Sequence, residues 1–152
     1  MNFKKILSLI LIIGLITILS SSIVFACTPR LENGATFTTP PGYSLESNAG
    51  NSGVSLKCDD GNVKIYVSSD VSDDVKQSLN GFDYKSSSTV NINGTNVQIK
   101  DYTNSIGLII HEYTFRKDNH DYQIFASADI DTQWNISNGN NPVNMIINTL
   151  KK

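Results

Sequence analysis

The sequence predicts an α+β domain in which two helices pack on an antiparallel β-sheet built from hairpins. Two pairs of segments with alternating apolar and polar residues flank the two-residue turn signals Asn93-Gly94 and Asp118-Asn119. The last ten residues instead space their apolar side chains as one face of a helix does. Runs of hairpin strands combined with few helices favour an α+β sandwich over an alternating α/β fold.

The N-terminal segment, residues 1–26, has the pattern of an export signal. Lys4 and Lys5 precede an uncharged apolar run over residues 6–19, and the segment ends with the small residue Ala26. We expect a signal peptide cleaved after Ala26. The alternative is a retained N-terminal membrane anchor, because residues 6–26 reach the ~20 residues that a membrane helix needs.

The next nine residues, 27–35, are expected to form a short polar tether, and residues 36–152 the sandwich domain. Within the domain, residues 36–39 are rich in strand-forming types, and Pro40-Pro41-Gly42 then forms a turn. A second short strand is expected over residues 43–45.

A hairpin is predicted for residues 53–58 and 62–67 around Asp59-Asp60-Gly61, since both segments alternate with period two. The period changes over residues 68–80, where Val71, Val75 and Leu79 are four residues apart. A serine N-cap and Gly81 at the end complete the pattern of a short amphipathic helix.

The Asn93-Gly94 turn fixes the register of the next hairpin, because a two-residue turn places all its apolar residues on one face. The predicted pairs are Ile92 with Thr95, Val90 with Val97, and Ser88 with Ile99.

A third hairpin is predicted around Asp118-Asn119, with Phe115 opposite Tyr122, Tyr113 opposite Ile124, His111 opposite Ala126, and Ile109 opposite Ala128. This face is apolar and should belong to the core. The other side carries Leu108, Ile110 and Phe125 at one end, which suggests partial cover by a helix.

The closing helix is expected to begin with Asn141 as N-cap and Pro142 as its first residue. Its apolar stripe consists of Val143, Ile146, Ile147 and Leu150.

The domain resembles the small extracytoplasmic domains of the PsbP-like type. The resemblance rests on the opening Phe37, Pro40, Gly42 and Tyr43, on the order of the hairpins, and on the closing NPVNMIINTL. It implies an α/β/α sandwich around an antiparallel sheet, in a family of exported or lipid-anchored accessory and binding proteins. No functional residue is carried over from it.

Charge and motifs exclude several functions. Without residues 1–26, ten basic residues face fourteen acidic ones, so phosphate-rich partners such as nucleic acid are disfavoured. His111 and Glu112 adjoin on a predicted strand and point to opposite faces, which does not suit a zinc helix. His111 is expected to be a hydrogen-bonded core histidine, and no ligand partners are found for His120.

The acidic residues allow one weak metal hypothesis, a calcium site, although turns and helix starts already explain each of them. These acids are Asp59, Asp60, Asp70, Asp73 and Asp74. We therefore expect no cofactor, no metal and no catalytic residue.

The covalent state of the two cysteines, Cys27 and Cys58, has three alternatives. Cys27 directly follows Ala26 and is a candidate for lipid attachment, with Val24 and Ala26 fitting that signal and Phe25 departing from it. A disulfide between Cys27 and Cys58 would suit an oxidising compartment. An unmodified Cys58 would suit its apolar row.

Surface residues supply the remaining candidates for modification and ligand binding. Asn93 and Asn135 lie in glycosylation sequons on expected turns. Tyr66, Tyr102 and Trp134 are candidates for an aromatic ligand surface, with core packing under loops as the alternative.

The sequence therefore predicts an exported, cell-envelope-associated binding or structural accessory domain without enzymatic activity. It would be secreted or anchored at the outer face of a prokaryotic membrane. Expected partners are the membrane, through the N-terminal segment or a lipid, and a protein or glycan. The alternative is a small extracytoplasmic hydrolase or carbohydrate-binding protein that uses the loop around Trp134.

Overall fold

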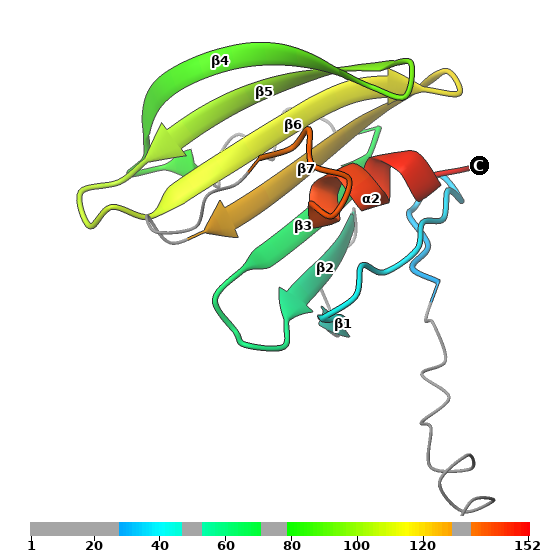
Figure 1. The fold of residues 1–152 in the computed structure, drawn as a ribbon, viewed down its shortest axis with the longest axis horizontal. Coiled ribbons are helices and arrows are strands. Elements are labelled where there is room, and N and C mark those ends of the chain that lie inside the picture. Colours follow the sequence, from blue (N-terminus) through cyan, green and yellow to red (C-terminus); the bar gives the residue numbers. More distant parts are fainter. Residues whose placement is uncertain (1–27, 47–52, 71–78, 129–134) are drawn as a thin grey trace, which may run out of the picture.

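One seven-stranded sheet forms the body of the protein (Figure 1). The computed structural model describes residues 28–46, 53–70, 79–128 and 135–152. The strands are β1 (Tyr43–Glu46), β2 (Gly53–Cys58), β3 (Lys64–Ser69), β4 (Asp83–Ile92), β5 (Thr95–Thr103), β6 (Ile109–Lys117) and β7 (His120–Ala128). Their order in the sheet is β1-β2-β3-β7-β6-β5-β4, and every neighbouring pair is antiparallel.

The registers of the β4–β5 and β6–β7 hairpins confirm the sequence prediction. Ile92 lies opposite Thr95 across the first turn, and Phe115 lies opposite Tyr122 near the second. The turn residues adopt positive φ, 46° at Asn93 and 50° at Asp118. Such turns match the right-handed twist of the strands, so the turn chemistry sets the pairing of all later residues.

Pairing of β3 with β7 joins an N-terminal group, β1-β2-β3, to a C-terminal group, β7-β6-β5-β4. Ile65 lies opposite Ala126, and Val67 lies opposite Ile124. The central position of these two strands explains why all four residues are fully buried: Ile65, Val67, Ile124 and Ala126 are each 0% exposed.

The helix α2 (Pro142–Thr149) begins as predicted. The side chain of Asn141 accepts hydrogen bonds from the N–H groups of Val143 and Asn144, and Pro142 occupies the first turn. The predicted apolar stripe is buried in the same core as the sheet: Val143, Ile146, Ile147 and Leu150. We call the sheet face that packs in this core the helix face, and the opposite one the far face.

The helix expected over residues 68–80 is not found as predicted. Ser68 and Ser69 belong to strand β3 and are buried, because their pairing with β7 extends the ladder through Ser69 opposite Tyr122. Residues 71–78, which carry Val71 and Val75, lie outside the described residues. Within the described ranges α2 is the one α-helix, so of the two predicted helices only the closing one is observed.

The segment expected to be a tether contributes to the core. Leu31 is 3% exposed and Ala35 is fully buried. Thr36 forms isolated bridges to Arg30 and Lys151, so the strand expected over residues 36–39 is reduced to this contact. The packing places the start of the folded body earlier in the chain than Thr36.

Candidate functional site

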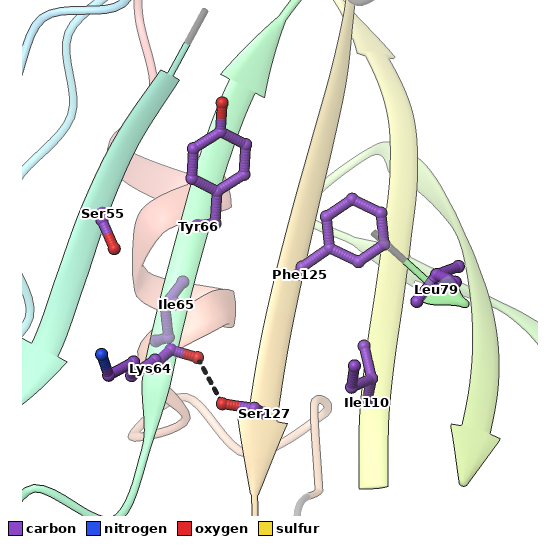
Figure 2. A pocket seen from close by; sticks show the side chains of 8 residues that line it. All are labelled: Ser55, Lys64, Ile65, Tyr66, Leu79, Ile110, Phe125 and Ser127. Carbon is purple, nitrogen blue, oxygen red and sulfur yellow. Dashed lines mark hydrogen bonds between the residues drawn. The ribbon is translucent and has the colours of Figure 1, made fainter. Parts of the chain in front are cut away.

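A pocket of about 440 Å³ lies on the far face (Figure 2). In Figure 2 the rings of Tyr66 and Phe125 stand in front of the sheet and α2 lies behind it. The lining comes from β2, β3, β6, β7 and the segment before β4, and it consists of Ser55, Lys64, Ile65, Tyr66, Leu79, Ile110, Phe125 and Ser127. Its size falls within the roughly 300–1,000 Å³ of small-molecule sites.

An aromatic pair forms the centre of the pocket wall. Tyr66 on β3 lies directly opposite Phe125 on β7, and both rings are half-buried. Ile110 and Leu79 extend the apolar wall beside Phe125. A solvated sheet face normally carries polar residues at such alternating positions, and this apolar set departs from that pattern.

The polar groups of the pocket already have partners. Ser55 Oγ donates to Glu46 Oε2 at 3.2 Å, and Lys64 Nζ lies 3.3 Å from Glu46 Oε1. Ser127 Oγ donates to the carbonyl oxygen of Lys64 at 3.4 Å. The surface left for a ligand is therefore mainly apolar, with positive charge at the Lys64 end.

A buried carboxylate adjoins the pocket. Glu112 lies opposite Phe125 in the β6–β7 ladder and is 8% exposed. Its Oε2 accepts from the Tyr102 hydroxyl at 2.8 Å, and its Oε1 accepts from Gln123 Nε2 at 2.6 Å. Burial, and then the bond to Glu112, raise the pKa of Tyr102 to about 12. The Oε1 atom of Gln123 is buried with no hydrogen-bond partner among the described residues.

The far face brings together two of the three predicted ligand-surface residues. Tyr66 lines the pocket, and Tyr102 lies directly opposite Ile110, which also lines it. Tyr84 meets Tyr102 edge-on, with ring centroids 6.0 Å apart. Trp134 lies outside the described residues.

Sequence reasoning missed most of the polar rim. Glu46, Ser55 and Ser127 carry no motif, and they meet only because β1, β2 and β7 are brought beside β3. The one available signal was the apolar character of Ile110 and Phe125 on the side of the hairpin away from the core.

His111 is hydrogen-bonded on the helix face, as expected. Its Nδ1 lies 2.7 Å from Asp101 Oδ1, and Ser86 Oγ donates to Asp101 Oδ2 at 2.7 Å. A serine nucleophile needs its hydroxyl on the histidine base. Here the serine is bonded to the aspartate instead, so these three residues are not arranged as a nucleophilic triad.

His120 has partners that the sequence did not reveal. Lys152 Nζ lies 2.7 Å from His120 Nε2, and His120 Nδ1 lies 2.9 Å from Asp70 Oδ2. Because an ammonium only donates, Nε2 accepts and Nδ1–H donates to the carboxylate. Partial burial acts to raise the pKa of Asp70, but its hydrogen bonds with His120, the backbone of Asp121 and Asn33 outweigh burial and lower that pKa.

The modification candidates are placed as follows. Cys58 is half-buried with a free thiol, and Cys27 lies outside the described residues. Asn93 Nδ2 donates to Asn148 Oδ1 at 2.8 Å, whereas Asn135 Oδ1 accepts from the N–H of Ser137 at 3.0 Å. Both sequon asparagines are exposed.

The described residues show neither a metal-binding cluster nor a membrane-spanning helix. They contain no group of three or more acidic, histidine or cysteine side chains placed to hold a metal ion. No helix among them is long and apolar enough to cross a membrane.

Comparison with known proteins supports the fold. No protein-family model matches the chain, and no curated protein matches it in sequence. Among solved structures, the chain is similar to cyanobacterial PsbP (CyanoP) from Synechocystis sp. PCC 6803, with a TM-score of 0.53 at 10% identity. The match covers 86% of this chain and 95% of the other. The resemblance seen in the sequence is confirmed at the level of architecture, and this chain has a PsbP-like fold.

Proposed function

We propose that this protein is an exported, cell-envelope-associated accessory domain that binds a ligand in its far-face pocket and has no catalytic activity. The observation that carries the proposal is the pocket of about 440 Å³, whose wall is apolar and whose serine and lysine side chains already bond to Glu46 or to the backbone. Such a site offers shape and apolar contact to a ligand, and it presents no activated nucleophile or base to it.

The cell-envelope location rests on the sequence of residues 1–26, with Lys4, Lys5, the apolar run and Ala26. Mass spectrometry of the N-terminal peptide from protein recovered in its host tests this. A peptide that begins at Cys27 supports export, and an acyl mass on Cys27 supports membrane anchoring. A chain that begins at Met1 and fractionates with the cytoplasm would contradict the proposal.

The binding role is tested by a thermal-shift screen of the purified protein against apolar metabolites, glycans and nucleotides. We expect stabilisation by apolar compounds, because ligand binding to the folded state raises the unfolding temperature. The variant Phe125→Ala should lose that response, while Tyr84→Ala on the same sheet face should keep it. A response confined to glycans would favour the carbohydrate-binding alternative around Trp134.

A further inference from the structure

We infer that the far-face pocket takes an amphipathic anion, with an apolar body against Tyr66, Phe125 and Ile110 and an acidic head group beside Lys57 and Lys64. This deepens the proposed binding role and rests on it. The inference combines the shape of the wall with the charges at one end of the pocket.

The wall selects an apolar body. The rings of Tyr66 and Phe125 and the side chains of Ile110 and Leu79 stand together in Figure 2. Because the hydroxyls of Ser55 and Ser127 already donate elsewhere, they offer a sugar only acceptor positions. Desolvating sugar hydroxyls without replacing their hydrogen bonds is unfavourable.

The charge at the Lys64 end of the pocket selects an anion. Lys57 lies directly opposite Lys64 across the β2–β3 ladder, so both side chains belong to the far face. Both residues are exposed. Within the part of the chain that the structure describes, Glu46 is the carboxylate paired with Lys64, at 3.3 Å. Like charges directly opposite on neighbouring strands repel, and an anion between them would relieve that repulsion.

The other acidic groups near this end belong to the turn after β2 or are hydrogen-bonded elsewhere. Asp60 accepts from the N–H of Asn62 at 3.0 Å within the turn after β2, which also carries Asp59. Farther along the same face, Glu112 has both oxygens occupied by Tyr102 and Gln123. Among the described residues, Lys64 lines this end of the pocket beside Glu46, and Lys57 adds a second positive charge on the neighbouring strand of the same face.

A matched pair of fluorescent probes tests the inference on the purified protein. Anilinonaphthalene sulfonate is anionic, and N-phenyl naphthylamine carries a similar ring system without the charge. We expect both to bind and the anion to bind more tightly. Since an exposed ion pair contributes about 0.2–1 kcal/mol, Lys57→Gln should weaken the anionic probe by about 1.4- to 5-fold and leave the neutral probe unchanged.

Variants separate the pocket from other surfaces. Ser127→Phe should fill the pocket and weaken both probes at least about tenfold without removing a core side chain. Phe125→Ala should act in the same direction, and the near-ultraviolet circular dichroism of each variant reports whether it has folded. Lys85→Gln, on the edge strand β4, is the matched charge control and should change neither affinity.

The outcomes distinguish the two proposals. If the neutral probe binds as tightly as the anion, or if Lys57→Gln and Lys85→Gln behave alike, selection of an anion is overturned while the binding role stands. If neither probe responds to Ser127→Phe and the thermal-shift screen is also silent, the binding role itself fails.

Discussion

The Tyr102 hydroxyl donates to Oε2 of Glu112 at 2.8 Å, and this bond holds a buried carboxylate in place across strands β5 and β6. Gln123 on β7 donates to the other carboxylate oxygen, so three strands are tied together on the far face. A buried charge is tolerated only when its hydrogen-bonding capacity is met. The pair therefore supports the sheet beside the pocket.

Tyr102→Phe is expected to lower the free energy of unfolding at neutral pH by about 1 kcal/mol, because Glu112 loses one donor. It should also make the free energy of unfolding depend less on pH above pH 10. The pKa of Tyr102 is raised from 10.0 to about 12, so its contribution is fully present below pH 10 and is lost as pH rises toward 12. Urea unfolding at a series of pH values measures both effects.

The control for this variant is Tyr84→Phe, which removes a hydroxyl from a residue that is 58% exposed. It should leave both the neutral stability and the alkaline slope close to those of the parent protein. Equal alkaline profiles for Tyr102→Phe and the parent would show that the bond to Glu112 does not hold the phenol protonated.

A relay of three asparagines joins the β4–β5 turn to α2. Asn93 donates to Asn148, Asn148 donates to Asn144 at 2.6 Å, and buried Asn144 donates to the carbonyl of Ile136 at 2.7 Å. We expect Asn148→Ala to cost about 1–2 kcal/mol of unfolding free energy, because it unpairs Asn93 and Asn144 together.

A double-mutant cycle with Asn93→Gly tests the relay, since glycine suits the positive φ of 46° at this turn position. The coupling energy should be at least about 0.5 kcal/mol. Asn140→Ala, in the exposed loop before α2, is the control and should be neutral. Purely additive losses in the cycle would contradict a direct Asn93–Asn148 interaction.

The local part of the fold could be predicted and the long-range part could not. Two-residue turns dictate register from the residues beside them, so Val90 opposite Val97 and Tyr113 opposite Ile124 followed from the sequence. The pairing of β3 with β7 joins segments about sixty residues apart, and no turn encodes it. The polar rim of the pocket depends on that pairing, which explains why Ser55 and Ser127 were not recognised.

The N-terminal segment illustrates the same limit. Leu31 and Ala35 stand among polar residues with no period of two or 3.6, so local pattern suggested a tether. They are buried because Thr36 pairs with Lys151 beside the end of α2. Tertiary contact, and not propensity, determines the structure of this segment.

Leu31→Ala is therefore expected to destabilise the protein by about 2–5 kcal/mol, as truncation of a buried leucine does. Glu32→Ala, at the exposed neighbouring position, should remain within about 0.5 kcal/mol of the parent. Chemical denaturation of both variants measures the difference. Similar stabilities for the two would mean that the segment is a tether after all.

Asp70→Asn addresses the acid stability of the contact between β3 and β7. Partial burial acts to raise the pKa of Asp70, but the pKa is lowered in the folded state because the hydrogen bond from His120, with those of Asp121 and Asn33, outweighs burial. A carboxyl group of this kind stabilises the fold above its unfolded pKa of about 4, and its contribution disappears as pH falls through the folded value.

The variant should thus lose stability less steeply than the parent as the pH falls below about 4, where the parent protonates Asp70. Asparagine tolerates the positive φ of 49° at this position, so backbone strain does not obscure the comparison. Glu32→Gln is the charge-matched control and should keep the acid profile of the parent. Lys152 also contacts His120, so Lys152→Gln is a second control. It should keep the parent's loss of stability at acid pH, which Asp70→Asn reduces. If both variants reduced that loss equally, the acid dependence would belong to His120 and not to Asp70.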